Sequence, residues 1–160
     1  GKEFINSILI AGFSALLIVF LVVLIRYKSF KYASPLVFTS ISEVIVILGL
    51  ASFIGWSIDL AAIAGILAAV GTGVDDQIVI TDEVLRKGVI KYSWKEKIKR
   101  AFFIIMTAYA TTFVAMLPLF RAGAGLLRGF AIATIAGITI GVFITRPAFA
   151  NIIEGLLEEE

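Results

Sequence analysis

The sequence predicts an all-α, polytopic membrane protein in which five spanning helices form one bundle. Of its 160 residues, 60% are hydrophobic and only 16% are charged, and the mean hydropathy is +1.04. Soluble domains are usually about 45–50% apolar. Five separate stretches each hold about 20 mostly apolar residues, which is the length that crosses the hydrocarbon core of a bilayer. The chain is therefore expected to be membrane-embedded along nearly its whole length, as one domain.

Each predicted helix is bounded by charged or turn-forming residues. The first has no charged residue, and the second contains only Glu43. The third contains two adjacent carboxylates, Asp75 and Asp76, and the fifth carries Arg128 near its start and Arg146-Pro147 near its end. The predicted helices are 4–25, 36–56, 60–80, 101–120 and 127–149.

The basic residues predict the orientation of the bundle. With five helices, eleven of the 14 lysines and arginines fall on one side, Arg146 among them, and only Lys2, Arg121 and Arg128 fall on the other. Lysine and arginine accumulate on the cytoplasmic side of membrane proteins. We therefore expect a multi-pass plasma-membrane protein with its N-terminus outside and its C-terminus in the cytoplasm. Because the sequence begins at Gly1 without methionine, we expect a segment of a longer protein.

The connection over about 82–100 mixes apolar and charged residues. This pattern favours a short cytoplasmic amphipathic helix at the membrane surface. A solvated link in which Trp94 anchors the membrane interface is an equally open alternative. The apolar residues concerned are Val84, Leu85, Val89, Trp94 and Ile98.

Small residues recur at every fourth position in the third and fifth helices. A spacing of four places them on one helix face, and small residues on one face let two backbones approach closely in lipid. We expect these faces to be packing surfaces, with a glycine-lined substrate groove as the alternative. The two series are Ala61, Gly65, Ala69 and Gly73, and Gly129, Ala133, Gly137 and Gly141.

Asp75 and Asp76 are the most unusual residues of the third helix. A carboxylate at the centre of a spanning helix costs roughly 2.5–3.5 kcal/mol on insertion scales, and such residues usually serve transport or proton transfer. The two side chains lie about 100° apart around the helix, so they face different ways. Asp75 shares its face with Ala64, Ala68 and Gly71, whereas Asp76 shares the small-residue face that includes Gly65, Ala69 and Gly73.

Several polar residues are expected at one depth in the membrane. Counted from a turn near Ser57, Glu43 and Asp75 differ by only about 6 Å in depth. No lysine or arginine is expected at that level. The acids would then be neutral or would meet a cation from a second chain, unless they are simply hydrated at the lipid–water boundary. The predicted polar layer comprises Glu43, Asp75, Asp76, Gln77, Thr111 and Thr112.

The stretch "DLAAIAGILAAVGTGVDDQIVITDE" (59–83) resembles the fourth transmembrane helix of the SecD family, part of the SecD–SecF protein-export complex. Ile63-Ala64-Gly65, Gly71, Val74, Asp75 and Gln77 fall on the family pattern. "GLLRGFAIATIAGITIGVFIT" (125–145) is similar to the family's last helix, and Thr111-Thr112 and Tyr27-Lys28 match further positions. Bacterial members usually have Ala-Asn where this chain has Asp76-Gln77, and often Asn at Glu43. "VDDQIVITDE" resembles the archaeal branch.

The resemblance implies a fold, partners and a role. SecD belongs to the resistance–nodulation–division (RND) superfamily, whose members have two six-helix halves, so this chain would be helices two to six. SecF would supply the other half of the bundle. The family is thought to use the proton gradient to help pull preprotein outward after it leaves the SecYEG channel. Asp75 matches the family's proton-carrying acid.

Two other classes of function stay open on the residues alone. One is a different RND exporter of lipids or drugs, and the other is a scaffold for the translocon without proton chemistry. An enzyme is not expected, because the chain has no histidine, cysteine or G-x-S-x-G motif. No metal site, cofactor or nucleic-acid partner is predicted, and the surrounding lipid bilayer is the expected environment.

Overall fold

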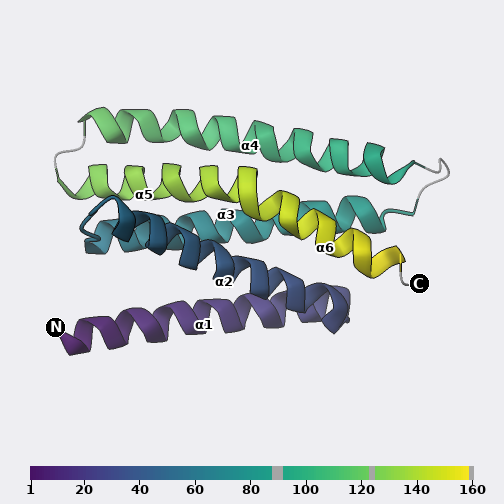
Figure 1. The fold of residues 1–160 in the computed structure, drawn as a ribbon, viewed down its shortest axis with the longest axis horizontal. Helices are drawn as coiled ribbons and strands as arrows, with labels where there is room; N and C mark the ends of the chain where they lie inside the picture. Colours follow the sequence, from purple (N-terminus) through teal and green to yellow (C-terminus); the bar gives the residue numbers. More distant parts are fainter. Residues whose placement is uncertain (88–91, 123–124, 159–160) are drawn as a thin grey trace.

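The chain forms a bundle of long helices that run roughly along one direction (Figure 1). The structure is a computed structural model that describes residues 1–87, 92–122 and 125–158. Within these residues, five continuous helical segments are long and apolar enough to cross a membrane, which confirms the predicted all-α, five-span fold. The elements are α1 (Lys2–Tyr27), α2 (Phe30–Phe53), α3 (Leu60–Leu85), α4 (Trp94–Ala122), α5 (Leu126–Ile140), the π-helix η1 (Gly141–Thr145) and α6 (Arg146–Glu158).

Most of the helices extend further than their apolar stretches. The helix α2 begins at Phe30, where the side chain of Ser29 accepts a hydrogen bond from the Lys31 backbone N–H at 3.2 Å. The fifth span continues through η1 and α6 to Glu158. A count of apolar residues locates the part of a helix inside hydrocarbon, whereas the backbone ladder continues through polar residues until a cap or turn ends it.

Most of the predicted amphipathic connection over 82–100 belongs to the two helices that flank it. Helix α3 continues to Leu85, and α4 already begins at Trp94. Residues 88–91, with Val89 among them, lie outside the described residues. The Lys97 ammonium donates a hydrogen bond to the Val84 carbonyl at 2.8 Å, so the start of α4 is tied directly to the end of α3. The amphipathic pattern of 94–100 thus belongs to the first two turns of a spanning helix.

Helix α3 lies in the interior of the bundle. It packs most extensively against α5 and also contacts α2, α4 and α6. Helices α1 and α4 lie on opposite outer sides, and the two chain termini are at opposite ends (Figure 1). The α1–α2 and α3–α4 connections lie at the same end as the C-terminus, and most of the basic residues belong to these connections or to the helix ends that flank them.

The small residues of α3 and α5 meet where these two helices touch. A Cβ atom at Gly65 would come within 2.6 Å of the Phe130 carbonyl oxygen and 2.8 Å of the Ala133 Cβ. A Cβ atom at Gly137 would overlap the Cβ of Ala69. The backbones can lie this close only because these positions carry no side chain.

Gly129 has a different neighbour. A Cβ there would come within 3.0 Å of the Asp59 carboxylate oxygens, and Asp59 caps α3 by accepting a hydrogen bond from the Ala62 N–H at 2.7 Å. Glycine at position 129 therefore leaves room for the cap of the neighbouring helix, which satisfies one of the free N–H groups at its start.

Asp82 joins α1 to α3 at the basic end of the bundle. Its carboxylate accepts hydrogen bonds from the Tyr27 hydroxyl and from the Arg26 guanidinium, each at 2.6 Å. The Arg26 and Asp82 side chains are about half exposed. The contact fixes the end of the otherwise lipid-facing α1 to the interior helix.

Candidate functional site: a buried ion cluster beside an exposed aspartate

Three helices bring an arginine and two carboxylates together inside the bundle. Arg146, at the start of α6, is completely buried, and Glu43 on α2 and Asp76 on α3 are 1% and 6% exposed. The Arg146 Nε donates to Asp76 Oδ2 at 3.1 Å, and its Nη1 donates to Glu43 Oε2. The prediction that the acids have no cationic partner in this chain was therefore wrong for Glu43 and Asp76.

A π-helix positions Arg146. In η1 the Arg146 backbone N–H donates to the carbonyl of Gly141, five residues earlier. Pro147 follows directly, and because proline lacks an N–H and clashes with the carbonyl four residues before it, it disfavours a regular α-helical ladder here. Single π-turns of this kind occur frequently at functional sites. The wider turn carries the span past Pro147 and aims the Arg146 side chain into the bundle.

Two glycines make room for the guanidinium group. A Cβ at Gly73 on α3 or at Gly141 in η1 would overlap atoms of the Arg146 guanidinium. These glycines belong to the same four-residue series as Gly65 and Gly137, which pack backbone against backbone. The two series therefore have two roles. One part of each series lets α3 and α5 pack closely, and the other part leaves space for the charged guanidinium group.

Thr145 completes the contacts of Glu43. Its hydroxyl lies 3.0 Å from Glu43 Oε2 and accepts a hydrogen bond of 2.7 Å from Arg146 Nη1. Three atoms near the cluster remain buried without a hydrogen-bond partner in the described residues: Glu43 Oε1, Gln77 Oε1 and Arg146 Nη2. Buried polar atoms of this kind are normally paired with protein or with ordered water.

The cluster contains one cation and two carboxylates. If both acids are ionised, its formal charge is −1, and binding one proton makes it neutral. Burying a net charge is costly unless it is paired and hydrogen-bonded. Chemically, the arrangement can hold or release a proton with a change in its net charge, and its members lie on three different helices.

Gln77 extends this polar region along α3. It is fully buried, and its amide donates a hydrogen bond of 2.8 Å to the hydroxyl of Thr39 on α2. Thr39 lies one helical turn before Glu43. Thus α2 presents two polar contacts in succession to α3, one from Thr39 and one from Glu43.

Asp75 lies on the other side of α3. Its side chain is exposed, and it forms no hydrogen bond or ion pair with the described residues, in contrast to Asp76 beside it. Ala64, Ala68 and Gly71 are exposed on the same side, and a Cβ at Gly71 would meet nothing within 4 Å. Helix α3 thus has a second small-residue face, which no helix of the described chain covers.

The residues of the predicted polar layer therefore separate into three groups. Glu43, Asp76 and Gln77 are buried between α2, α3 and α6. Asp75 is on the free face of α3. On α4, Thr111 is exposed and donates to the carbonyls of its own helix, and no described hydrogen bond links it or Thr112 to the ion cluster.

The sequence-based prediction missed the role of Arg146 because it placed this residue near the end of a helix over 127–149 and counted it among the basic residues of the cytoplasmic side. One signal was available: the chain stays largely apolar after the proline, through "AFANIIEGLL". An arginine inside a continuing span, rather than after it, must find carboxylates in the bundle. The partners themselves lie 70 and 103 residues away along the chain, so no local pattern identifies them.

Comparison with known proteins gives a consistent result. The family model described as "Protein export membrane protein SecD/SecF, C-terminal" matches residues 1–154. The chain is 58% identical over 159 residues to the protein-export membrane protein SecD of Methanocaldococcus jannaschii, and 52% identical over 161 residues to that of Methanothermobacter thermautotrophicus. These matches cover 99% and 96% of this chain but 40% of each relative.

A more distant relative is the protein translocase subunit SecD of Synechocystis, which is 34% identical over 150 residues, or 89% of this chain and 31% of the relative. The chain therefore spans about 40% of the length of the most similar relatives named here.

Proposed function

Because the chain belongs to the SecD/SecF C-terminal membrane family, we propose that it is the membrane-spanning part of a protein-export subunit that uses the proton gradient to assist late preprotein translocation. Asp75 is the proton carrier, and the SecF partner packs against the free face of α3. The SecYEG translocon and the translocating preprotein are the other partners. The exposed position of Asp75 on a small-residue face is the single observation that carries this proposal.

The free face of α3 suits close packing by a second membrane protein. Ala64, Ala68 and Gly71 would let a partner helix approach closely in lipid. Asp75 would then be buried at a helix interface, away from both lipid and water. A carboxyl group in that position either binds a proton or finds a cation on the partner.

The buried cluster would couple the state of Asp75 to the helix packing. Asp76 follows Asp75 directly on α3 and is bonded to Arg146, which in turn holds Glu43. A proton on Asp75 removes a negative charge next to Asp76 and so changes the field at Arg146. Because the cluster links α2, α3 and α6, its preferred arrangement biases the packing of these helices.

Replacing Asp75 by asparagine tests the proposal. In vesicles that contain the full-length protein with SecF and the translocon, we expect Asp75→Asn to reduce proton-driven preprotein export at least tenfold. The conservative Asp75→Glu should retain part of the activity. The measurements are the proton flux and the amount of preprotein protected from protease.

Copurification with SecF separates this proposal from a scaffold role. We expect the Asp75→Asn protein to bind SecF as well as the parent does, since asparagine has the same size as aspartate. If export and proton flux in that variant equal those of the parent, Asp75 is not the proton carrier. If export falls only in proportion to lost SecF binding, the subunit is a scaffold.

We propose that the basic end of the bundle faces the cytoplasm, because lysine and arginine accumulate on the cytoplasmic side of membrane proteins. The chain has no cysteine, so single cysteines can report the orientation. In intact cells, a membrane-impermeant maleimide should label Arg121→Cys and not Lys95→Cys, in a full-length protein without other cysteines. If only Lys95→Cys is labelled, the bundle has the opposite orientation, with its basic end outside the cell.

A further inference from the structure

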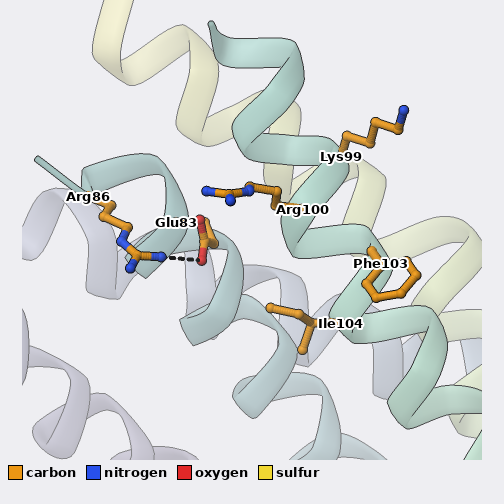
Figure 2. A pocket seen from close by; sticks show the side chains of 6 residues that line it. All are labelled: Glu83, Arg86, Lys99, Arg100, Phe103 and Ile104. Atoms are coloured by element: carbon orange, nitrogen blue, oxygen red, sulfur yellow. Dashed lines mark hydrogen bonds and ion pairs between the residues drawn. The ribbon is translucent and has the colours of Figure 1, made fainter. Parts of the chain in front are cut away.

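A cavity of about 440 Å³ lies between the end of α3 and the start of α4 (Figure 2). Glu83, the lining residue nearest in sequence to the ion cluster, lies about two helical turns beyond Asp76 on α3, and neither the family match nor the proposed proton coupling uses the cavity. Three of its six lining residues are positively charged and one is negatively charged. The lining residues are Glu83, Arg86, Lys99, Arg100, Phe103 and Ile104.

The Arg86 and Arg100 side chains lie near Glu83, whereas the Lys99 side chain points away from it (Figure 2). The Glu83 carboxylate accepts a hydrogen bond of 3.4 Å from Arg86, and the Arg100 side chain extends from α4 toward it (Figure 2). The Arg100 guanidinium also lies 4.5 Å from the centre of the Tyr92 ring. One carboxylate cannot neutralise two guanidinium groups, so the cavity keeps an excess of positive charge, to which Lys99 adds from its edge.

The apolar wall of the cavity continues into the lipid-facing surface. Phe103 and Ile104 are 74% and 46% exposed, and they belong to α4, which is apolar enough to span the membrane. Lys99 and Arg100 are the last charged residues before the uncharged stretch 101–120. The cavity therefore lies at the depth where a bilayer changes from headgroups to hydrocarbon.

We propose that this cavity binds the phosphate headgroup of an anionic membrane lipid, with an acyl chain lying along Phe103 and Ile104. Guanidinium groups match phosphate oxygens in geometry and charge. Basic pockets between transmembrane helices are a recognised kind of site for anionic headgroups. A soluble phosphate would use only the charged wall of the cavity, whereas a lipid uses both walls.

The test measures lipid binding to the full-length protein with SecF, in detergent micelles titrated with phosphatidylglycerol or phosphatidylcholine and observed by native mass spectrometry. We expect a preference for phosphatidylglycerol. In the double variant Lys99→Gln/Arg100→Gln, its dissociation constant should rise about tenfold. The matched control, Lys95→Gln/Arg121→Gln, removes the same charge from the same helix outside the cavity and should change the constant less than twofold.

A third variant tests the apolar wall. Phe103→Ala should weaken phosphatidylglycerol binding while leaving the charged residues in place, and soluble glycerol phosphate at millimolar concentration should not displace the lipid. The proposal is overturned if the two double variants lose binding equally, if phosphatidylcholine binds as well, or if glycerol phosphate competes effectively. Circular dichroism of each variant checks that the helices are retained.

Discussion

Replacing Arg146 by glutamine is expected to lower the free energy of unfolding by about 3–5 kcal/mol, because it leaves buried carboxylates without their cation. Both Glu43 and Asp76 lose a charged hydrogen-bond donor in this variant. Arg146 is completely buried and the two acids are nearly so, so bulk solvent has little access to the carboxylates. The measurement is denaturant unfolding in detergent micelles. A loss below about 1 kcal/mol would mean that the ion pairs contribute little.

A rescue variant separates the charge from the packing. The triple variant Arg146→Gln/Glu43→Gln/Asp76→Asn removes all three charges, and it changes the two acids to amides of the same size, so it should recover most of the stability that Arg146→Gln loses through unpaired charge. Arg128→Gln is the matched control on the same continuous span. Arg128 is exposed, and its replacement should change stability by no more than about 0.5 kcal/mol. If the triple variant is no more stable than Arg146→Gln, unpaired charge is not the cause of the loss.

Alanine at Gly137 is expected to destabilise the α3–α5 contact by about 1–3 kcal/mol, the usual cost of overpacking. Its Cβ would overlap that of Ala69. The two atoms lie between closely packed helix backbones, which cannot easily move apart to relieve the overlap. The same change at Gly49, where a Cβ meets nothing within 4 Å, should be neutral or stabilising, because alanine favours a helix by up to about 1 kcal/mol over glycine.

The exchange Ala69→Gly/Gly137→Ala moves the methyl group from one helix to the other. We expect this double variant to be more stable than Gly137→Ala alone, measured as the midpoint of thermal unfolding in the same micelles. If the exchange gives no recovery, the close approach of α3 and α5 at Ala69 does not determine stability.

The Arg146 and Gly137 variants probe two different roles of the glycines in α3, α5 and η1. Gly65 and Gly137 keep α3 and α5 close, and Gly73 and Gly141 give space to the Arg146 guanidinium. A small residue at a helix contact is often explained by packing alone. Here the same repeat also places a charge among helices, so the ion cluster and the α3–α5 contact are parts of one interface.

The two adjacent acids in the second half of α3, Asp75 and Asp76, also differ in what surrounds them. Asp76 faces into the chain and is held by Arg146, whereas Asp75 faces out and forms no described bond. Adjacent residues on a helix point about 100° apart. The division therefore follows from helix geometry once one face is covered by α2, α5 and α6. The sequence predicted that the two acids lie on different faces, but it predicted no cationic partner within this chain for either of them.

By itself, the sequence determined the membrane class, the five spans, the small-residue faces of α3 and α5 and the different facing of Asp75 and Asp76. These follow from composition and from the helical period, which are local properties of the chain. Only the tertiary structure decided that α5 continues through a π-helix past Pro147 and that Arg146 turns inward to pair with Glu43 and Asp76. The physical reason is that a buried charge is placed by partners far away in the chain, and these become neighbours only when the helices pack.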